Sequence, residues 1–346
     1  MRACDIAGQI LNSAWYSIDL IRVDLQTLGM MYPNPDTIAA AAPLIAPFIR
    51  QTPLLEVEAK ALGLPGPVSF KLEHTQITGT FKVRGAFFNM LTRDVPATGV
   101  VAASGGNHGA AVAYAATTLG HQSRVFVPAV IAKEEKLKRM RHFGAEVVMT
   151  KGSVGACMEE YAAYADATGA LSVHPYDTIP TLTGQGTIAH EIEAQMTLMD
   201  QGGVDTIIVS TGGGGLIGGV AAWAQDRIKV VSAETEGTNT LERSLREGPD
   251  IDVGASGVAA SSLGGPRLGV DSYAVIKDHV NEAVIVPDSA VFEAASRLWE
   301  ATRLIGEPGS AVALAALTSG AYVPEKDERV CVVLCGGNEV PNWFLE

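Results

Sequence analysis

The chain has only four cysteines in 346 residues, Cys4, Cys157, Cys331 and Cys335, and they form no CxxC pair. Cysteines this sparse exclude a disulfide framework and offer no structural zinc site. Positive charge is also scarce, since 25 lysines and arginines face 38 aspartates and glutamates, for a formal net charge of −13. An acidic chain is poorly suited to a nucleic-acid backbone or an anionic membrane. We therefore expect no nucleic-acid or membrane partner, and a reducing cytoplasmic location.

Long apolar runs are absent from the N-terminus, where Asp5 and Asp19 interrupt any candidate secretion signal. Residues 95–123 and 206–225 carry no charge, but both contain glycine clusters, which a lipid-facing helix would not favour. We interpret both stretches as buried core. Residues 1–34 match no later pattern and are assigned to an N-terminal extension whose order the sequence leaves open.

From Val68 onward, short runs rich in valine and isoleucine alternate with helical patterns. This alternation predicts an α/β fold with parallel strands covered by helices. Glycines at 120 and 144 suit the left-handed caps of two of those helices. The expected strands are 68–73, 100–103, 123–128, 145–150, 205–210, 229–234, 282–287 and 329–335, and the expected helices include 109–119 and 133–143.

Lys82 stands at a predicted strand-to-helix transition, in the run Gly79-Thr-Phe-Lys-Val-Arg-Gly. Burial and the positive end of a helix dipole would both disfavour its ammonium form. A lysine amine without its proton is the nucleophile that a Schiff base requires. The alternative is a surface lysine paired with Glu73, and this motif alone leaves both interpretations open.

Two glycine-rich loops each separate a predicted strand from a predicted helix. Residues 104–109, Ser-Gly-Gly-Asn-His-Gly, could form a carboxylate cradle at a helix N-terminus, although the same residues also suit a plain N-cap. Residues 212–215 are four consecutive glycines, whose backbone amides could surround a phosphate. Gly213, Gly215 and Gly218 also match GxGxxG, with Glu234 placed to bind a ribose. That alternative is a nicotinamide-dinucleotide-dependent oxidoreductase using Gly213–Gly218 and Glu234.

A third glycine-rich motif, Cys335-Gly-Gly-Asn, stands at the end of the last predicted strand. The ends of parallel strands form the ligand-binding edge of an open sheet, so Cys335 could face a site there. Cys331 lies inside the same hydrophobic run, and we expect it to pack in the core.

The chain resembles the fold-type II pyridoxal-phosphate enzymes, and among them the threonine/serine dehydratase (ammonia-lyase) family. The resemblance spans residues 35–346 and rests on four motifs in this order: Gly79-Thr-Phe-Lys-Val-Arg-Gly-Ala, Ser104-Gly-Gly-Asn-His-Gly, the four glycines from Gly212, and Cys335-Gly-Gly-Asn. It implies an α/β fold of two open, twisted, mostly parallel sheets covered by helices, of the tryptophan synthase beta-like type. It also implies a large cofactor-binding domain, residues 35–99 and 177–346, and a small inserted domain, residues 100–176.

The same resemblance implies the cofactor, pyridoxal 5'-phosphate, and a role for each matching residue. Lys82 would form the Schiff base and act as general base. The remaining cofactor contacts would come from Phe81 beside the ring, Asn107 at the ring hydroxyl, Gly212, Gly213, Gly214, Gly215 and Leu216 at the phosphate, and Cys335 near the pyridine nitrogen. The substrate carboxylate would be bound by Ser104, Gly105, Asn107 and His108.

The implied reaction is a β-elimination that converts a small hydroxy amino acid, such as L-threonine or L-serine, to a 2-oxo acid and ammonia. Racemisation is disfavoured, because Gly105 replaces the serine that acts as a base in the family's racemases. We expect no metal, since Thr240 falls where relatives carry a later metal-binding carboxylate. The chain ends at Glu346 without room for a regulatory domain, which favours a catabolic enzyme, and a homodimer or higher homo-oligomer is expected.

Two other functions stay open at this point. If Arg267 binds a second substrate carboxylate, the enzyme would be a 3-hydroxyaspartate dehydratase, although a surface arginine explains the residue equally simply. A non-catalytic binding module on the same fold would keep the glycine loops but would not need Lys82.

Overall fold

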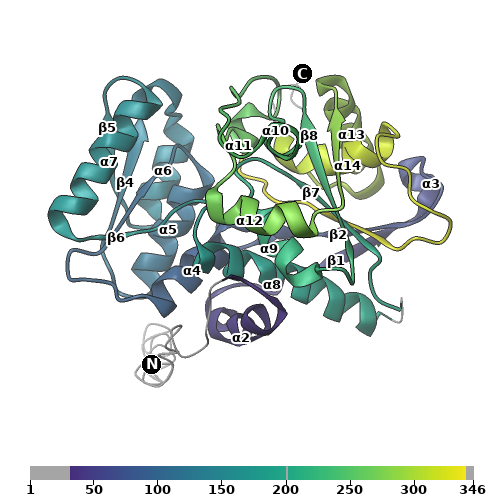
Figure 1. The fold of residues 1–346 in the computed structure, drawn as a ribbon, viewed down its shortest axis with the longest axis horizontal. Helices are drawn as coiled ribbons and strands as arrows, with labels where there is room; N and C mark the ends of the chain where they lie inside the picture. Colours follow the sequence, from purple (N-terminus) through teal and green to yellow (C-terminus); the bar gives the residue numbers. More distant parts are fainter. Residues whose placement is uncertain (1–31, 200–201, 340–346) are drawn as a thin grey trace, which may run out of the picture.

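The structure is a computed structural model that describes residues 32–199 and 202–339. Its backbone forms two separate sheets with helices around each, seen on the left and the right of Figure 1. Cys4 and nearly all of the predicted extension 1–34 lie outside the described residues. The prediction of an α/β fold with two mostly parallel sheets is confirmed.

The large sheet has six strands in the order β1-β2-β10-β7-β8-β9. Only β1 runs antiparallel to its neighbour, and the other pairs are parallel. Its central strands are buried on both faces, as expected where helices cover a parallel sheet on both sides. The strands are β1 (Leu54–Val57), β2 (Val68–Lys71), β7 (Thr206–Ser210), β8 (Lys229–Thr235), β9 (Glu282–Val286) and β10 (Val330–Val333).

The small sheet has four strands, all parallel, in the order β5-β4-β3-β6. They are β3 (Val100–Ala103), β4 (Ser123–Pro128), β5 (Glu146–Thr150) and β6 (Leu171–Ser172). All four lie in the segment predicted as the small inserted domain, while the domain boundaries themselves stay a prediction.

Helices cover both sheets, and α4 joins them. The hydrophobic core around α13 and α14 fills one face of the large sheet, and that around α8 and α9 fills the other. Helix α4 packs against α8 and also against α5 of the small sheet, so its N-terminus lies where the two sheets meet (Figure 1). The helices are α2 (Pro35–Ile45), α3 (Ala59–Leu62), α4 (Lys82–Thr92), α5 (Asn107–Thr118), α6 (Glu134–His142), α7 (Val154–Thr168), α8 (Ile179–Leu198), α9 (Gly215–Ala224), α10 (Thr240–Glu247), α11 (Ala260–Leu263), α12 (Val270–His279), α13 (Asp288–Thr302) and α14 (Pro308–Thr318), with 3-10 turns η2 (Ala46–Phe48), η3 (Glu73–Thr75) and η4 (Ala129–Ile131).

The strand predictions agree with the structure at β3 and β4 and differ by one or two residues at the ends of the other predicted strands. Two observed strands, β1 and β6, were not predicted. Strand β1 is an edge strand with one fully buried side chain, Val57, and β6 has two residues, so neither carries the long apolar run that identifies an inner strand.

Both predicted helix caps are present, since Gly120 and Gly144 have φ of +78° and +94° after α5 and α6. The uncharged stretches 95–123 and 206–225 are β3 with α5 and β7 with α9, and both belong to the buried core. Across residues 32–199 and 202–339, the search for a helix that could span a membrane found none.

Candidate active site

Lys82 is the first residue of α4, and its ammonium group lies in the interior. Its Nζ donates a hydrogen bond to the Pro175 carbonyl at 2.6 Å and lies 5.0 Å from the centre of the Phe81 ring. Burial lowers the pKa of Lys82 to about 8, against the opposing influence of Cys335 and Glu307. A substantial fraction of the amine is therefore unprotonated in mildly alkaline solution, as a nucleophile or base requires.

The alternative partner of Lys82 is not available to it. Both oxygens of Glu73 accept hydrogen bonds from the Arg84 guanidinium, at 2.7 and 2.9 Å. Because Arg84 binds Glu73, the pairing of Lys82 with Glu73 does not form. The alternative of a surface lysine is thus wrong.

The four-glycine loop joins β7 to α9 and leaves donors without acceptors. Gly214 has φ +90° at the N-cap of α9, a conformation that favours glycine. Among the described residues, the amides of Gly212, Gly213 and Gly214 have no acceptor, and the buried Ser210 hydroxyl also lacks a partner. A Cβ at Gly213 would overlap the Tyr176 ring. Free amides and a free hydroxyl at a helix N-terminus suit an anion such as a phosphate.

Asn107 begins α5 and reaches across to the large sheet. Its Nδ2 donates to both carboxylate oxygens of Glu307, at 2.9 and 3.0 Å, and its Oδ1 accepts from Asn338 Nδ2 at 2.7 Å. These contacts hold the side-chain amide of Asn107 in one orientation beside Lys82.

Cys335 follows β10 and lies against the start of α4. Its carbonyl accepts from the Phe81 amide at 3.2 Å, and its Sγ is 3.5 Å from the Ser310 hydroxyl. Burial raises the pKa of the Cys335 thiol to about 12, with Glu307 acting in the same direction. The thiol is therefore neutral at physiological pH. Cys331 is buried in the core, as predicted.

In the Ser104–Gly109 loop, two side chains predicted to bind the substrate carboxylate contact other groups of the protein. The Ser104 hydroxyl accepts from the Gly106 amide at 3.1 Å, which is a local turn contact. His108 is buried, with Nε2 2.8 Å from the Val173 carbonyl, and burial lowers its pKa to about 3. The imidazole is thus a neutral group engaged inside the fold.

Lys82, Asn107, Cys335 and the four-glycine loop surround one cavity of about 120 Å³. All nine residues predicted to bind the cofactor line it, whereas Ser104, Gly105 and His108 of the predicted substrate site do not, and Asn107 belongs to both sets. The lining residues are Phe81, Lys82, Asn107, Tyr176, Ser210, Thr211, Gly212, Gly213, Gly214, Gly215, Leu216, Ile217, Ser262, Leu263, Gly265, Glu307 and Cys335.

Five polar residues of the cavity were not among the predicted site residues: Tyr176, Ser210, Thr211, Ser262 and Glu307. Tyr176 lies outside any glycine motif, so no local signal identified it, whereas Ser262 stands two residues before the pair Gly264-Gly265 in the loop 257–267, which the sequence did suggest as a substrate loop. Glu307 did leave a signal, because an acid directly before Pro308 at the start of an apolar helix marks a buried helix N-terminus.

Glu234, the residue proposed for a ribose, is buried and already bound. Its two oxygens accept from the amides of Leu241 and Glu242 at 2.7 and 2.8 Å, at the start of α10. Burial raises the pKa of Glu234 to about 8. A carboxylate enclosed in this way cannot bind a ribose, which argues against the dinucleotide alternative.

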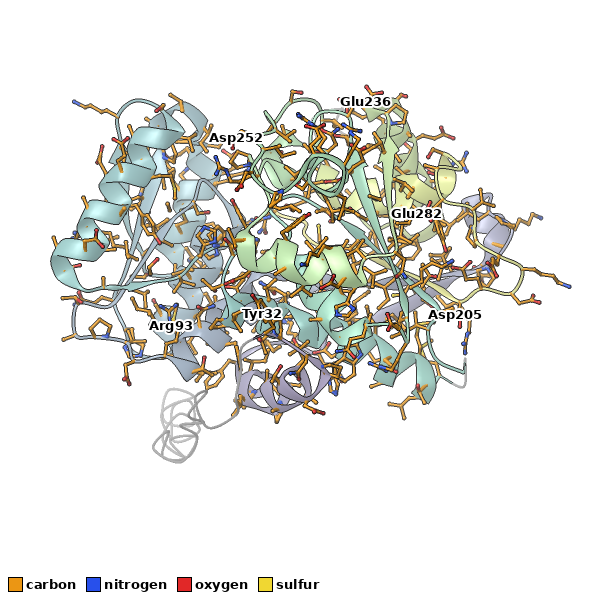
Figure 2. The ribbon with its side chains drawn as sticks, in the orientation of Figure 1. Tyr32, Arg93, Asp205, Glu236, Asp252 and Glu282 are labelled. Carbon is orange, nitrogen blue, oxygen red and sulfur yellow. The ribbon has the colours of Figure 1, made fainter. Side chains whose placement is uncertain are left out.

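Arg267, the residue proposed for a second substrate carboxylate, forms an exposed ion pair with Asp252, at 2.8 Å. Asp252 is labelled in Figure 2, in the region of α11. The two planar groups face each other through two hydrogen bonds, so the guanidinium is occupied.

A lysine with a lowered pKa beside an anion cradle defines an enzyme site that can hold a phosphorylated aldehyde covalently. The family model described as "Pyridoxal-phosphate dependent enzyme" matches residues 45–336. The chain therefore belongs to the pyridoxal-phosphate dependent enzyme family. This confirms the predicted cofactor and the resemblance on which the prediction rested.

Similar proteins with assigned names are consistent with this family. The chain is 36% identical to an L-threonine ammonia-lyase of Geobacter sulfurreducens over 298 residues, which cover 84% of this chain and 72% of the relative. It is 34% identical to a phenylserine dehydratase of Ralstonia pickettii over 325 residues, covering 92% and 96%. The structure of maize serine racemase matches with a TM-score of 0.83 and 29% identity, covering 90% of this chain and 96% of that one.

The residues present fit pyridoxal phosphate. The unpaired amides of the glycine loop and the unpaired Ser210 hydroxyl are donors for its phosphate, and the Lys82 amine can bond its aldehyde carbon. The neutral thiol of Cys335 lies beside them in the cavity and brings no charge to the ring.

Proposed function

We propose that this enzyme is a hydroxy-amino-acid dehydratase, which converts L-threonine or L-serine to a 2-oxo acid and ammonia by β-elimination. The observation that carries the proposal is Lys82, a buried amine with a pKa of about 8 at the edge of an anion cradle. The names of the relatives support it, since they include an L-threonine ammonia-lyase and a phenylserine dehydratase.

Each residue of the cavity has a proposed task. When bound, pyridoxal phosphate withdraws electrons from the Cα of the substrate. Lys82 takes the Cα proton as general base, and the amides of Gly212–Leu216 hold the phosphate. Asn107 directs an amide proton to the ring hydroxyl, and Phe81 packs beside the ring. The substrate loses its β-hydroxyl as water, and readdition of water releases the 2-oxo acid and ammonia.

The cavity favours elimination over racemisation for two reasons. Gly105 has no side chain that could move a proton on the opposite face of Cα, and a Cβ built there would lie only 2.9 Å from Ile131 Cδ1. In addition, the neutral Cys335 thiol would not keep the pyridine nitrogen protonated, which weakens stabilisation of the carbanion and lets elimination compete better. This matters because serine racemases are found among the relatives at 31% identity.

The substrate carboxylate is proposed to bind the loop from Ser104 to His108. Backbone amides at the N-terminus of α5 would supply most of the donors, together with the Ser104 hydroxyl and the Asn107 amide. The His108 side chain contributes by fixing the loop, because its imidazole binds Val173 inside the fold.

Three further proposals concern the whole molecule. We infer a large domain of residues 35–99 and 177–346 with a small inserted domain 100–176, supported by the separation of the two sheets. We also infer a homodimer or higher oligomer and a cytoplasmic location. Sedimentation of the full-length protein as a monomer at all concentrations would contradict the oligomer.

The decisive experiment for the function is the visible spectrum of the purified protein before and after borohydride, followed by peptide mapping and a 2-oxo acid assay. We expect a visible band that borohydride abolishes, a pyridoxyl group on Lys82, and 2-oxo acid from threonine or serine without D-serine. A cofactor-loaded protein that releases no 2-oxo acid, or one that mainly interconverts serine enantiomers, would contradict the dehydratase.

A further inference from the structure

Glu307 is a buried carboxylate whose only bound partners among the described residues are neutral. It directly precedes α14, is 4% exposed and lines the same cavity as Lys82. Its oxygens accept from Asn107 Nδ2 at 2.9 and 3.0 Å and from the Asn338 amide at 3.4 Å. No arginine or lysine of residues 32–199 and 202–339 forms an ion pair with it. A buried carboxylate without a cationic partner is costly to maintain, so its retention calls for a functional reason.

The first consequence of this placement is the orientation of Asn107. A side-chain amide can turn over and exchange its oxygen and nitrogen. Here the carboxylate of Glu307 accepts only, and Asn338 Nδ2 donates to the Asn107 oxygen at 2.7 Å, so both contacts select one orientation. Asn107 also lines the cavity, so a ligand there meets its amide in this fixed orientation.

The second consequence concerns the charge of Glu307. Burial disfavours the ammonium form of Lys82, and Cys335 and Glu307 are the groups that favour it. Burial also raises the pKa of Glu307 itself, so its hydrogen bonds to Asn107, rather than its charge, carry its influence on the site. The other charged groups near Glu307 are Lys136 and Glu339, which form an ion pair at 2.9 Å and oppose each other's influence on it.

We propose that Glu307 is a positioning residue of this reaction, which orients the Asn107 amide toward the cofactor. The proposal rests on the proposed function, because it assigns a role within the same site. Glu307 acts through one neighbour across the cavity, Asn107 on α5.

The test uses Glu307→Gln and Glu307→Ala in the full-length enzyme. Glutamine keeps the shape and an oxygen acceptor but removes the charge. Since an acceptor for the Asn107 amide remains, we expect Glu307→Gln to keep the cofactor Kd within about threefold of the parent's. Alanine frees the Asn107 amide, and we expect the Kd for pyridoxal phosphate, measured by fluorescence on reloading the stripped chain, to rise about tenfold or more.

Glu339→Gln is the matched control, because it removes a carboxylate near Glu307 that makes no contact with Asn107. We expect its cofactor Kd to match that of the parent. If Glu307→Ala also leaves the cofactor Kd unchanged, or if Glu307→Gln raises it as much as Glu307→Ala does, the positioning role is wrong. Measurement of the cofactor Kd needs no substrate. The expected pattern of Kd values without 2-oxo acid production would therefore reject the dehydratase and retain the role of Glu307.

Discussion

Lys71, which is buried, and Lys82, which is half-buried, are two lysines of one short segment with opposite surroundings. Lys71 ends β2 with no exposed side-chain surface, and its Nζ donates to Glu191 at 2.7 Å, to Gln195 at 2.8 Å and to the Thr52 carbonyl at 2.9 Å. The three protons of an ammonium group are thereby all bound. Lys82 has one bound acceptor among the described residues, the Pro175 carbonyl.

The difference shows what separates a structural lysine from a reactive one in the same fold. Burial lowers the pKa of both, but at Lys71 the bound carboxylate of Glu191 and the nearby charge of Glu73 oppose the shift, and at Lys82 no carboxylate is bound to the ammonium. A buried lysine whose charge is compensated holds the fold together, whereas one with a single neutral acceptor is ready to lose its proton.

The two lysines are also connected. Arg84, on the same helix as Lys82, binds Glu73 and Glu191 at 2.7 Å each, and Glu191 in turn binds Lys71. Two cations and two anions thus form one neutral cluster beneath α4. The cluster anchors the helix that carries Lys82 and occupies the carboxylates that would otherwise compete for it.

The largest expected effect is on catalysis, from Lys82→Ala. Loss of the nucleophile and general base should lower turnover by about 10³-fold or more. A 2-oxo acid assay measures this, and reduction with borohydride should no longer fix a pyridoxyl group to the chain. Lys82→Arg is the matched control for charge, because it keeps a cation but cannot form the Schiff base, and it should fail in the same way. Turnover above a tenth of the parent's value in either variant would contradict the assigned role.

The next effect is on stability, from Arg84→Met, which leaves Glu73 buried without its cation. Removal of one partner from a buried ion cluster typically costs about 3–5 kcal/mol of unfolding free energy. Urea denaturation of the cofactor-free chain measures it. Arg124→Met removes an arginine from the exposed pair with Glu146, at 2.6 Å, and should cost under about 1 kcal/mol. Equal losses in the two variants would mean that the buried cluster is no more important than a surface pair.

The same contrast explains how much of the site could be predicted from the sequence. Lys82 and the glycine loop were identified because glycines beside strand ends form a motif that can be recognised in the local sequence. The ion cluster beneath α4 was not predicted, because its members come from β2, η3, α4 and α8. No pattern in the sequence near Arg84 indicates that Glu191, 107 residues further along the chain, is its partner. The inner strands were predicted well since their burial on both faces requires continuous apolar runs, whereas β1 and β6 depend on neighbours that only the fold supplies.

The smallest expected effect on activity comes from Arg267, which lies in a surface ion pair. Arg267 is 54% exposed and bound to Asp252, which is 64% exposed, so water and salt screen the pair. We expect Arg267→Ala to leave kcat/KM for threonine and serine within about twofold of the parent, because a screened surface pair contributes little. The same variant should be assayed with 3-hydroxyaspartate against Arg267→Lys. If activity on that substrate exists and Arg267→Ala abolishes it selectively, the arginine must leave Asp252 to bind the second carboxylate, and its surface pairing would be a resting state of the substrate site.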